Sequence, residues 1–360
     1  MALYYPDQTM VLPMTTIRRE RLLPPDAFGE VLVNELQRVD AYTVVARGVI
    51  PARYLLLDLM NPFGLSDPAQ VLDYIQVEPG AVVEAGQALA ADHTKKRGPV
   101  LRAPAGGLVS QLIDGRLVLE TDLTTYEVRA GFTGTVTSVR PGRGVLLETT
   151  GALIQGVWGN GQSVFGLLKS EPMGGLTALE SGEFVTEWRG AIVVTAGPLT
   201  RDSLRRAVAA GLGGLIGPSM HAHLREFALG LKIPIMLTEG FGAERMSAPT
   251  HGLLMDCAGK QAALEARVPQ RWQGDRPEVI VPQAGERQTA PLARDEPLRL
   301  GGDVRITRSP YLGMVGKIKS LPTSPQAIEN GLRLLVAEVQ LPTGRTVKIP
   351  LANLELFGRG

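Results

Sequence analysis

Short apolar stretches separated by glycine and proline recur along the chain, and helical spacing is confined to a few segments. Between residues 75 and 113 apolar and polar residues alternate, which is the period of half-buried strands. The alternating apolar positions are Val77, Val82, Leu89, Val100, Leu108 and Val109. Pro79-Gly80 and Ala85-Gly86 provide turns between these strands. The pattern therefore predicts a small unit of short strands.

This alternation over residues 77–109 resembles the barrel-sandwich hybrid of biotinyl and lipoyl domains, a small flattened β-barrel. Lys96 falls at the position of the lysine that this family modifies. The tip sequence His-Thr-Lys-Lys-Arg over 93–97 differs from the Glu-Ala-Met-Lys-Met of biotin carriers and from the Asp-Lys-Ala of lipoyl carriers. The resemblance implies the fold, and it makes Lys96 a candidate for modification.

Two other segments indicate an internal duplication. GEVLVNELQRVDAYTVVARG, which begins at Gly29, resembles IQVEPGAVVEAGQALA, which begins at Ile75. Residues 128–136 likewise resemble residues 101–109. Repeated segments of this kind predict repeated structural units. We therefore expect residues 26–50 and 125–155 to close a second barrel.

The segments around these units have their own signals. Residues 51–74 break the strand pattern, and Ser66-Asp67-Pro68 is a helix start, so we expect a short helical insertion. Asp114-Gly115 predicts a hairpin. Residues 1–25 are extended and end in a basic run, and we expect a peripheral arm that packs on the first domain. Residues 1–168 are thus assigned to a β-rich barrel-sandwich hybrid region with an N-terminal arm.

Residues 188–282 have a different character. Three apolar segments, at 190–195, 214–217 and 233–238, alternate with segments of helical spacing. Thr200 is a candidate N-cap for the first helix, and Gly211 follows its end. Strand, helix, strand, helix, strand in this order predicts a parallel α/β module of the swivelling or doubly wound type.

Polar side chains follow the three predicted parallel strands. Ligands of open α/β sheets bind at the carboxyl ends of strands, and these ends carry Thr195, Ser219, Thr238 and Glu239. We predict a polar ligand crevice there, with Glu239 partly buried and its pKa raised. The sequence provides no acid or base partner beside Glu239, which disfavours catalysis.

The last part of the chain begins after a polar linker over residues 283–298. GGDVRITRSPYLGMVGKIKSLP resembles a KOW motif, and the resemblance implies an SH3-like five-stranded barrel over 299–360. The positions that carry the resemblance are Val304, Ile306, Tyr311, Gly313, Val315, Gly316 and Ile318. The expected fold is therefore multidomain and mainly β, with one α/β module.

This last domain has nine Lys and Arg residues against four Asp and Glu residues, a local charge of +5. KOW domains of ribosomal and transcription-elongation proteins contact RNA, DNA or polymerase. The resemblance implies Arg305, Arg308, Lys317 and Lys319 as phosphate contacts. Contact with a protein partner, and simple solvation of outward-facing strand positions, remain alternatives.

Composition narrows the class of protein. The 360 residues are 44% hydrophobic and 20% charged, which is typical of globular chains. The net charge of +1 favours neither nucleic acid nor an anionic membrane for the whole protein. The single cysteine, Cys257, fits a reducing compartment. We find no signal peptide, no apolar run of membrane-spanning length and few metal ligands, so we expect a cytoplasmic protein without membrane contact, metal or cofactor.

Three functions from different classes compete. The first is a non-catalytic scaffold or adaptor with a protein partner, associated with the transcription or translation machinery through the KOW-like domain. The second is an enzyme or small-ligand-binding protein that uses the α/β crevice. The third is a carrier biotinylated or lipoylated at Lys96. The absence of an evident catalytic set in the sequence favours the scaffold.

Overall fold

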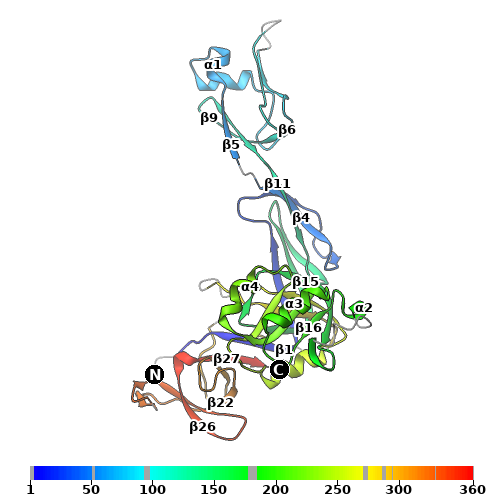
Figure 1. Ribbon diagram of the computed structural model, residues 1–360. Helices are drawn as coiled ribbons and strands as arrows, with labels where there is room; N and C mark the ends of the chain where they lie inside the picture. Colours follow the sequence, from blue (N-terminus) through cyan, green and yellow to red (C-terminus); the bar gives the residue numbers. More distant parts are fainter. Residues whose placement is uncertain are drawn as a thin grey trace.

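A computed structural model describes residues 4–50, 53–92, 98–176, 185–270, 275–285, 289–293, 295–328 and 330–359. The chain is mainly β, and one mixed sheet of 16 strands runs through these residues. The molecule is elongated: residues 53–122 lie at one end and the C-terminal residues at the other (Figure 1). None of the helices in the described ranges is long and apolar enough to cross a membrane.

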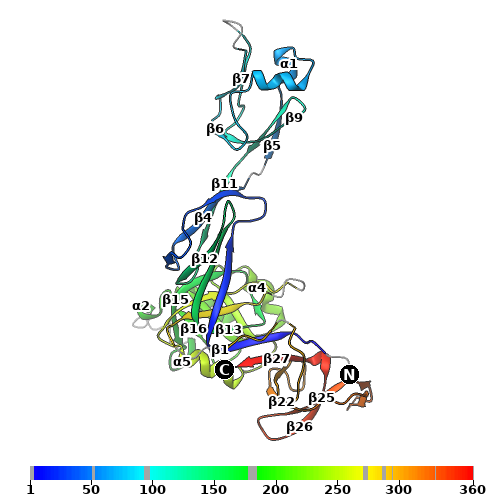
Figure 2. The ribbon, with the colours of Figure 1, turned by 180° about the vertical axis from the view of Figure 1, so that it is seen from behind.

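The first strand is central, which differs from the peripheral arm that we expected. β1 (Gln8–Leu22) pairs antiparallel with β13 (Gly144–Gln155), and its first residues pair parallel with β27 (Leu354–Arg359). It therefore crosses from the C-terminal part of the molecule to its middle (Figure 2). Thr15, Ile17 and Arg21 are buried. The basic run is therefore part of β1, and its last arginine, Arg21, is paired with Glu265 in the interior.

Residues 18–50 and 124–155 form what we call the base unit. Its central hairpin is β4 with β11, and β2 pairs with β4 at the edge of this small sheet. Two short ladders, β3 with β12 and β12 with β13, complete the unit. Besides β13, its strands are β2 (Phe28–Val31), β3 (Arg38–Val39), β4 (Val44–Ile50), β11 (Thr124–Arg129) and β12 (Gly134–Arg140).

Residues 53–122 form a second unit, the head, with its own core around Leu89, Leu117 and Leu119. Asp67 caps a 3₁₀ helix that starts at Pro68, which confirms the predicted helical insertion. Asp114 and Gly115 have positive φ in the predicted hairpin. The elements are β5 (Arg53–Asp58), α1 (Met60–Phe63), η1 (Pro68–Asp73), β6 (Val82–Val83), β7 (Ala88–Ala91), β8 (Val100–Arg102), β9 (Gly107–Ile113) and β10 (Arg116–Thr121).

The head repeats the backbone hydrogen bonds of the base unit. Four backbone hydrogen bonds of the base unit have a counterpart in the head. With the N–H donor named first, Leu36–Val136 corresponds to Gly80–Val109, Val136–Gln37 to Val109–Ala81, Thr43–Asp40 to Gln87–Glu84, and Leu23–Arg143 to Leu59–Gly115. Buried residues correspond in the same way: Leu23 and Leu59, Val39 and Val83, Val45 and Leu89, Val136 and Val109, and Leu147 and Leu119. The two units are therefore two copies of one structure, as the sequence correspondence predicted.

One copy is inserted into the other. The β4–β11 hairpin of the base unit corresponds to β7–β8 of the head, and the pair Ala46–Val128 is equivalent to Ala90–Leu101. β7 and β8 are separated by eight residues in the sequence, whereas β4 and β11 are separated by the whole head. The antiparallel register of β4 with β11 continues without a shift into that of β5 with β10, from the pair Ile50–Thr124 to the pair Arg53–Thr121. The head consequently projects away from the rest of the chain (Figure 1).

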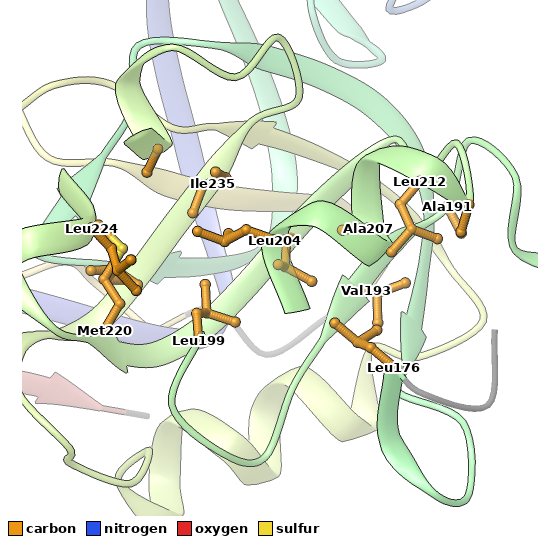
Figure 3. Packing of buried hydrophobic residues seen from close by; sticks show 14 of the residues in the cluster. Leu176, Ala191, Val193, Leu199, Leu204, Ala207, Leu212, Met220, Leu224 and Ile235 are labelled. Carbon is orange, nitrogen blue, oxygen red and sulfur yellow. The ribbon is translucent and has the colours of Figure 1, made fainter. Parts of the chain in front are cut away.

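The α/β module follows the base unit. Its strands β15 to β18 are parallel neighbours in sequence order, and Thr200 and Ser203 form a capping box at α3. Figure 3 shows the core under the helices, in which Leu204 and Ala207 of α3 pack with Val193 of β16. The elements are β14 (Trp158–Gly159), β15 (Ser163–Ser170), α2 (Val185–Trp188), β16 (Ile192–Val194), α3 (Arg201–Ala209), β17 (Gly214–Met220), η3 (Ala222–Leu224), α4 (Arg225–Leu229) and β18 (Ile235–Phe241).

This module begins earlier in the chain than the expected residue 188, because β15 starts at Ser163 and its last residues pair with β16. Its other face packs against α5 (Ala248–Asp256), β19 (Gln261–Glu265) and β20 (Glu278–Pro282). Sequence reasoning missed α5, since Pro249 and Gly252 interrupt its helical signal. β20 pairs with β13, so the module and the base unit share one sheet.

The C-terminal unit, residues 298–359, contains a mostly antiparallel set of strands with a core that includes Val304, Ile318 and Val339. The expected linker before it lies along the N-terminal residues, where Thr289 N donates to Met14 O. The elements are β21 (Asp303–Ile306), β22 (Val315–Ser320), β23 (Gln326–Ala327), β24 (Arg333–Leu334), β25 (Val336–Gln340), β26 (Thr346–Pro350), η4 (Leu351–Asn353) and β27.

Because the two copies have separate cores, we expect their equivalent leucines to control separate parts of the molecule. Leu119→Ala in the head and Leu147→Ala in the base unit should each destabilise their own unit by about 2–5 kcal/mol. Hydrogen exchange of the full chain measures this by peptide. With L119A, exchange should quicken in the head while β13 and β20 stay protected. Faster exchange throughout the chain would contradict separate cores.

Candidate functional site

A large hollow lies where β1, the end of β18 and the C-terminal unit meet. It has a volume of about 1530 Å³ and is open to solvent. Its lining combines apolar residues such as Leu153 and Phe241 with arginines and carboxylates from four parts of the chain. Its walls hold buried charges, and we call this region the junction.

Arg305 of β21 is the centre of the first charged cluster. Its side chain donates to Glu355, to the carbonyl oxygen of Thr238 at 2.6 Å, and to Glu239 Oε2 at 3.2 Å. Arg276 joins the cluster, with its Nη2 at 2.8 Å from Glu355 Oε2 and its Nη1 at 2.8 Å from Thr9 Oγ1. The cluster thus joins β1, the α/β module and the C-terminal unit.

The two carboxylates of this cluster differ in their pKa. Burial raises the pKa of Glu239 above its ordinary value, and Arg305 only partly opposes this. Burial would also raise the pKa of Glu355, but the charges of Arg305 and Arg276 outweigh it, so this pKa lies below its ordinary value. The difference arises because Glu355 has two close guanidinium partners and Glu239 has one.

A second cluster lies further along β1, under the base unit. Arg21 is buried, pairs with Glu265 and donates from Nε to the carbonyl oxygen of Ala130 at 2.7 Å. Arg267 also pairs with Glu265, at 2.7 Å. Burial alone would raise the pKa of Glu265, but these two arginines lower it below its ordinary value. Arg19 pairs with Glu278 of β20 in the same way.

The central arginine of each cluster is hydrogen-bonded through all three of its nitrogens. The three nitrogens of Arg305 all have acceptors, and Glu239 Oε1 accepts from Ser247 N, at the N-cap of α5, at 3.0 Å. Buried charges are tolerated when they are paired and hydrogen-bonded. These groups therefore connect the units, and their hydrogen-bonding capacity is directed to the protein itself.

The predicted α/β crevice is not one site. Thr195 lines a separate hollow of about 280 Å³ beside α3, whereas Glu239 lines the junction. Ser219 donates to the carbonyl oxygen of Glu244, and Thr238 is buried in β18. Parallel strands do bring their ends to one edge, but Ser247 before α5 and Gly313 of the C-terminal unit lie against Glu239 there. This carboxylate is buried, with a raised pKa as predicted, yet it also caps a helix.

The predicted phosphate contacts are also divided. Arg305 is only 4% exposed, so the assignment of a surface contact to this residue is wrong. Its neighbours in the cluster, Glu239 and Glu355, account for a charged residue inside a strand. Lys317 is exposed but lies 3.2 Å from Asp303 on the adjacent strand. Arg308 and Lys319 are exposed and stay candidates.

The sites for a modified lysine or a metal ion have no support in the described residues. Lys96 lies outside the described residues. The rings of His221 and His223 stack with centroids 5.7 Å apart. Among the residues that the structure describes, no group of three or more potential ligands could hold a metal ion.

Sequence reasoning missed Arg276 and Glu355 as members of the junction. Glu355 lies between two core residues, Leu354 and Leu356, in the apolar first part of β27. A charged residue in an apolar strand is a signal for a buried partner. The sequence could not show which partner, because Arg276, Arg305 and Glu239 come from distant segments.

The two junction carboxylates should respond differently to neutralisation. Glu355→Gln leaves buried Arg305 and Arg276 without their main charge partner and should destabilise the chain by about 3–5 kcal/mol at pH 7. Glu239→Gln should change stability by less than about 1 kcal/mol, because burial already disfavours this ion. Urea unfolding of the full chain followed by circular dichroism measures both.

The pH dependence has opposite signs at these residues. The stabilisation from Glu355 is present above its unfolded-state pKa and is lost as pH falls through its lower folded-state pKa, so the deficit of E355Q should shrink in acid. The stability linked to protonated Glu239 is lost as pH rises through its raised pKa, so E239Q should gain relative to the native chain as pH rises. Equal effects of both variants at all pH values would contradict the assignment.

Comparison of the chain with models of known protein families, and with curated protein sequences, gave no match. The function must therefore be argued from the arrangement of the units and their surfaces.

Proposed function

We propose that the protein is a non-catalytic scaffold or adaptor that holds its head away from its other units for contact with a protein partner. The observation that carries this proposal is the insertion of one structural copy into the β4–β11 hairpin of another. This arrangement places a complete second unit at the far end of the molecule and leaves its sides accessible (Figure 1).

The surface of the head supports docking. Tyr54 and Leu56 are exposed on β5, and Ile113 is exposed on β9 of the same sheet. β5 is a terminal strand of this four-stranded sheet, so one of its edges is open to pairing within the described structure. Exposed apolar groups on an edge strand are typical of surfaces that bind another protein.

The junction supports the rigid part of a scaffold. Buried pairs connect β1, the α/β module and the C-terminal unit, and one sheet continues through all of them. Such an assembly holds the α/β module and the C-terminal unit together as the support from which the head projects.

The fold resemblances agree with this role but do not decide the partner. The repeated units are proposed to be barrel-sandwich hybrids and the C-terminal unit an SH3-like barrel of the KOW type. Association with the transcription or translation machinery through Arg308 and Lys319 is the finer form of the proposal. Folds host many functions, so this form rests on analogy.

The second candidate is a protein that binds a small ligand in the junction hollow. The volume of the hollow and the raised pKa of Glu239 favour it. The satisfied hydrogen bonds of the lining arginines favour the scaffold instead. A carrier role depends on Lys96.

Co-purification from native cells tests the scaffold with two matched variants of the full chain. Leu56→Glu alters the head, and Leu300→Glu is its control in the C-terminal unit; the two leucines are 65% and 66% exposed. A burial-dependent contact should lose at least about tenfold in affinity when a charge replaces its apolar anchor. We therefore expect a stoichiometric protein partner that is lost from L56E and kept by L300E.

Other outcomes would overturn this proposal. Turnover of a small molecule by the purified chain, or a bound metabolite in the junction, would support the second candidate. A mass adduct on Lys96 in the native protein would support a carrier. Equal partner recovery with L56E and L300E would remove the head as the docking unit.

A further inference from the structure

The two structural copies differ at one turn in a way that folding does not explain. In the base unit the turn over residues 34–37 closes with Gln37 N donating to Asn34 O, and its third residue is Leu36, with φ 65°. In the head the equivalent turn closes with Ala81 N donating to Glu78 O, and its third residue is Gly80, with φ 92°. The same backbone shape is thus built from leucine in one copy and from glycine in the other.

Leucine is unfavourable here for two physical reasons. Positive φ at the third residue of such a turn brings Cβ close to the backbone, which is why glycine or asparagine is preferred. The side chain of Leu36 is also 83% exposed, so it gains little from burial in return. A non-glycine residue held in this conformation indicates a role beyond folding.

Neighbouring residues extend Leu36 into a surface, which we call the β2 turn surface. Phe28 on β2 and Leu32 just after it are also exposed. β2 is the terminal strand of its three-stranded sheet, so this surface lies at a sheet edge. Three large apolar side chains are thus exposed within nine residues of the chain, at the sheet edge and in the turn that follows it.

The charges around this surface define the partner. Between residues 30 and 40 there are three exposed carboxylates, Glu30, Glu35 and Asp40, against one exposed base, Arg38, a net charge of −2. Two arginines from other strands face this segment, Arg47 opposite Glu30 and Arg140 beside the Val139 that donates to Glu35, and they are paired with Glu127 and Glu20. An acidic rim disfavours an anionic membrane and favours a surface that carries basic groups. An apolar centre with a charged rim is the usual composition of a protein docking site.

We propose that the β2 turn surface binds a protein partner that offers an apolar socket for Leu36 with a basic rim. This inference rests on the proposed adaptor role and adds a second docking surface, on the base unit, with a stated chemistry. Leu36 is the anchor, because its exposed and conformationally unfavourable side chain is what the head lacks at Gly80.

Reciprocal substitutions in the full chain test whether Leu36 contributes to the stability of the fold. Leu36→Gly should leave the melting temperature unchanged or raise it by up to about 4 °C, because it relieves the backbone. Gly80→Leu should lower the melting temperature by about 2–4 °C, since a side chain there meets open space and only the backbone effect remains. A clear loss of stability in L36G would show that Leu36 serves the fold and would overturn the proposal.

Photo-crosslinking tests the binding part. Benzoylphenylalanine is placed at position 36, and at position 80 as the control, in the full chain in native cells. The proposal requires a protein crosslinked from 36 and not from 80. That protein, once purified, must bind the native chain, bind L36G at least about tenfold more weakly, and bind less tightly as salt rises.

The remaining outcomes each decide against the proposal. Crosslinks to a second copy of this chain, equal binding of L36G, or no product specific to position 36 would overturn it. Binding of the chain to phosphatidylserine vesicles through Leu36 would assign the surface to a membrane instead. The head variant L56E separates this inference from the adaptor role of the head, because Leu36-dependent binding should survive in it.

Discussion

The backbone pairing of β1 is the interaction on which the arrangement of the molecule depends. One edge of this strand carries β13, and through β13 the base unit and β20 of the α/β module; its first residues carry β27 of the C-terminal unit. A strand shared by three units must have its charged residues satisfied in the interior. Arg19 and Arg21 meet this requirement by pairing with Glu278 and Glu265.

The duplication explains the shape of the other end. Since the base unit and the head share strand order, register and hydrogen bonds, the hairpin that ends one unit is also a place where a second can be inserted without disturbing the core. As a result, the residues that hold the units together are separate from those that are exposed for binding. The buried arginine and glutamate pairs hold three units together, while the head and the β2 turn surface stay free of these constraints and expose apolar side chains.

Local pattern determined much of this structure. The short strands within 75–113, the turn at Asp114-Gly115, the N-cap at Thr200 and the three parallel strands of the α/β module could all be read from the chain, because each depends on neighbours in sequence. The duplication was readable too, since equivalent buried positions, such as Val39 and Val83, hold similar apolar residues in both copies. Leu36 became informative only when the hydrogen bonds showed that it occupies the place of Gly80.

Tertiary structure alone decided which charges are buried and what they meet. Arg305 has the spacing of an outward strand residue, yet it is buried because Glu355 and Glu239 approach it from segments that no local pattern connects. The same holds for β1, whose basic residues are typical of an exposed arm until Glu265 and Glu278 are in place. Sequence periodicity reports which face of a strand is apolar, whereas the partner of a buried charge depends on how distant strands are brought together.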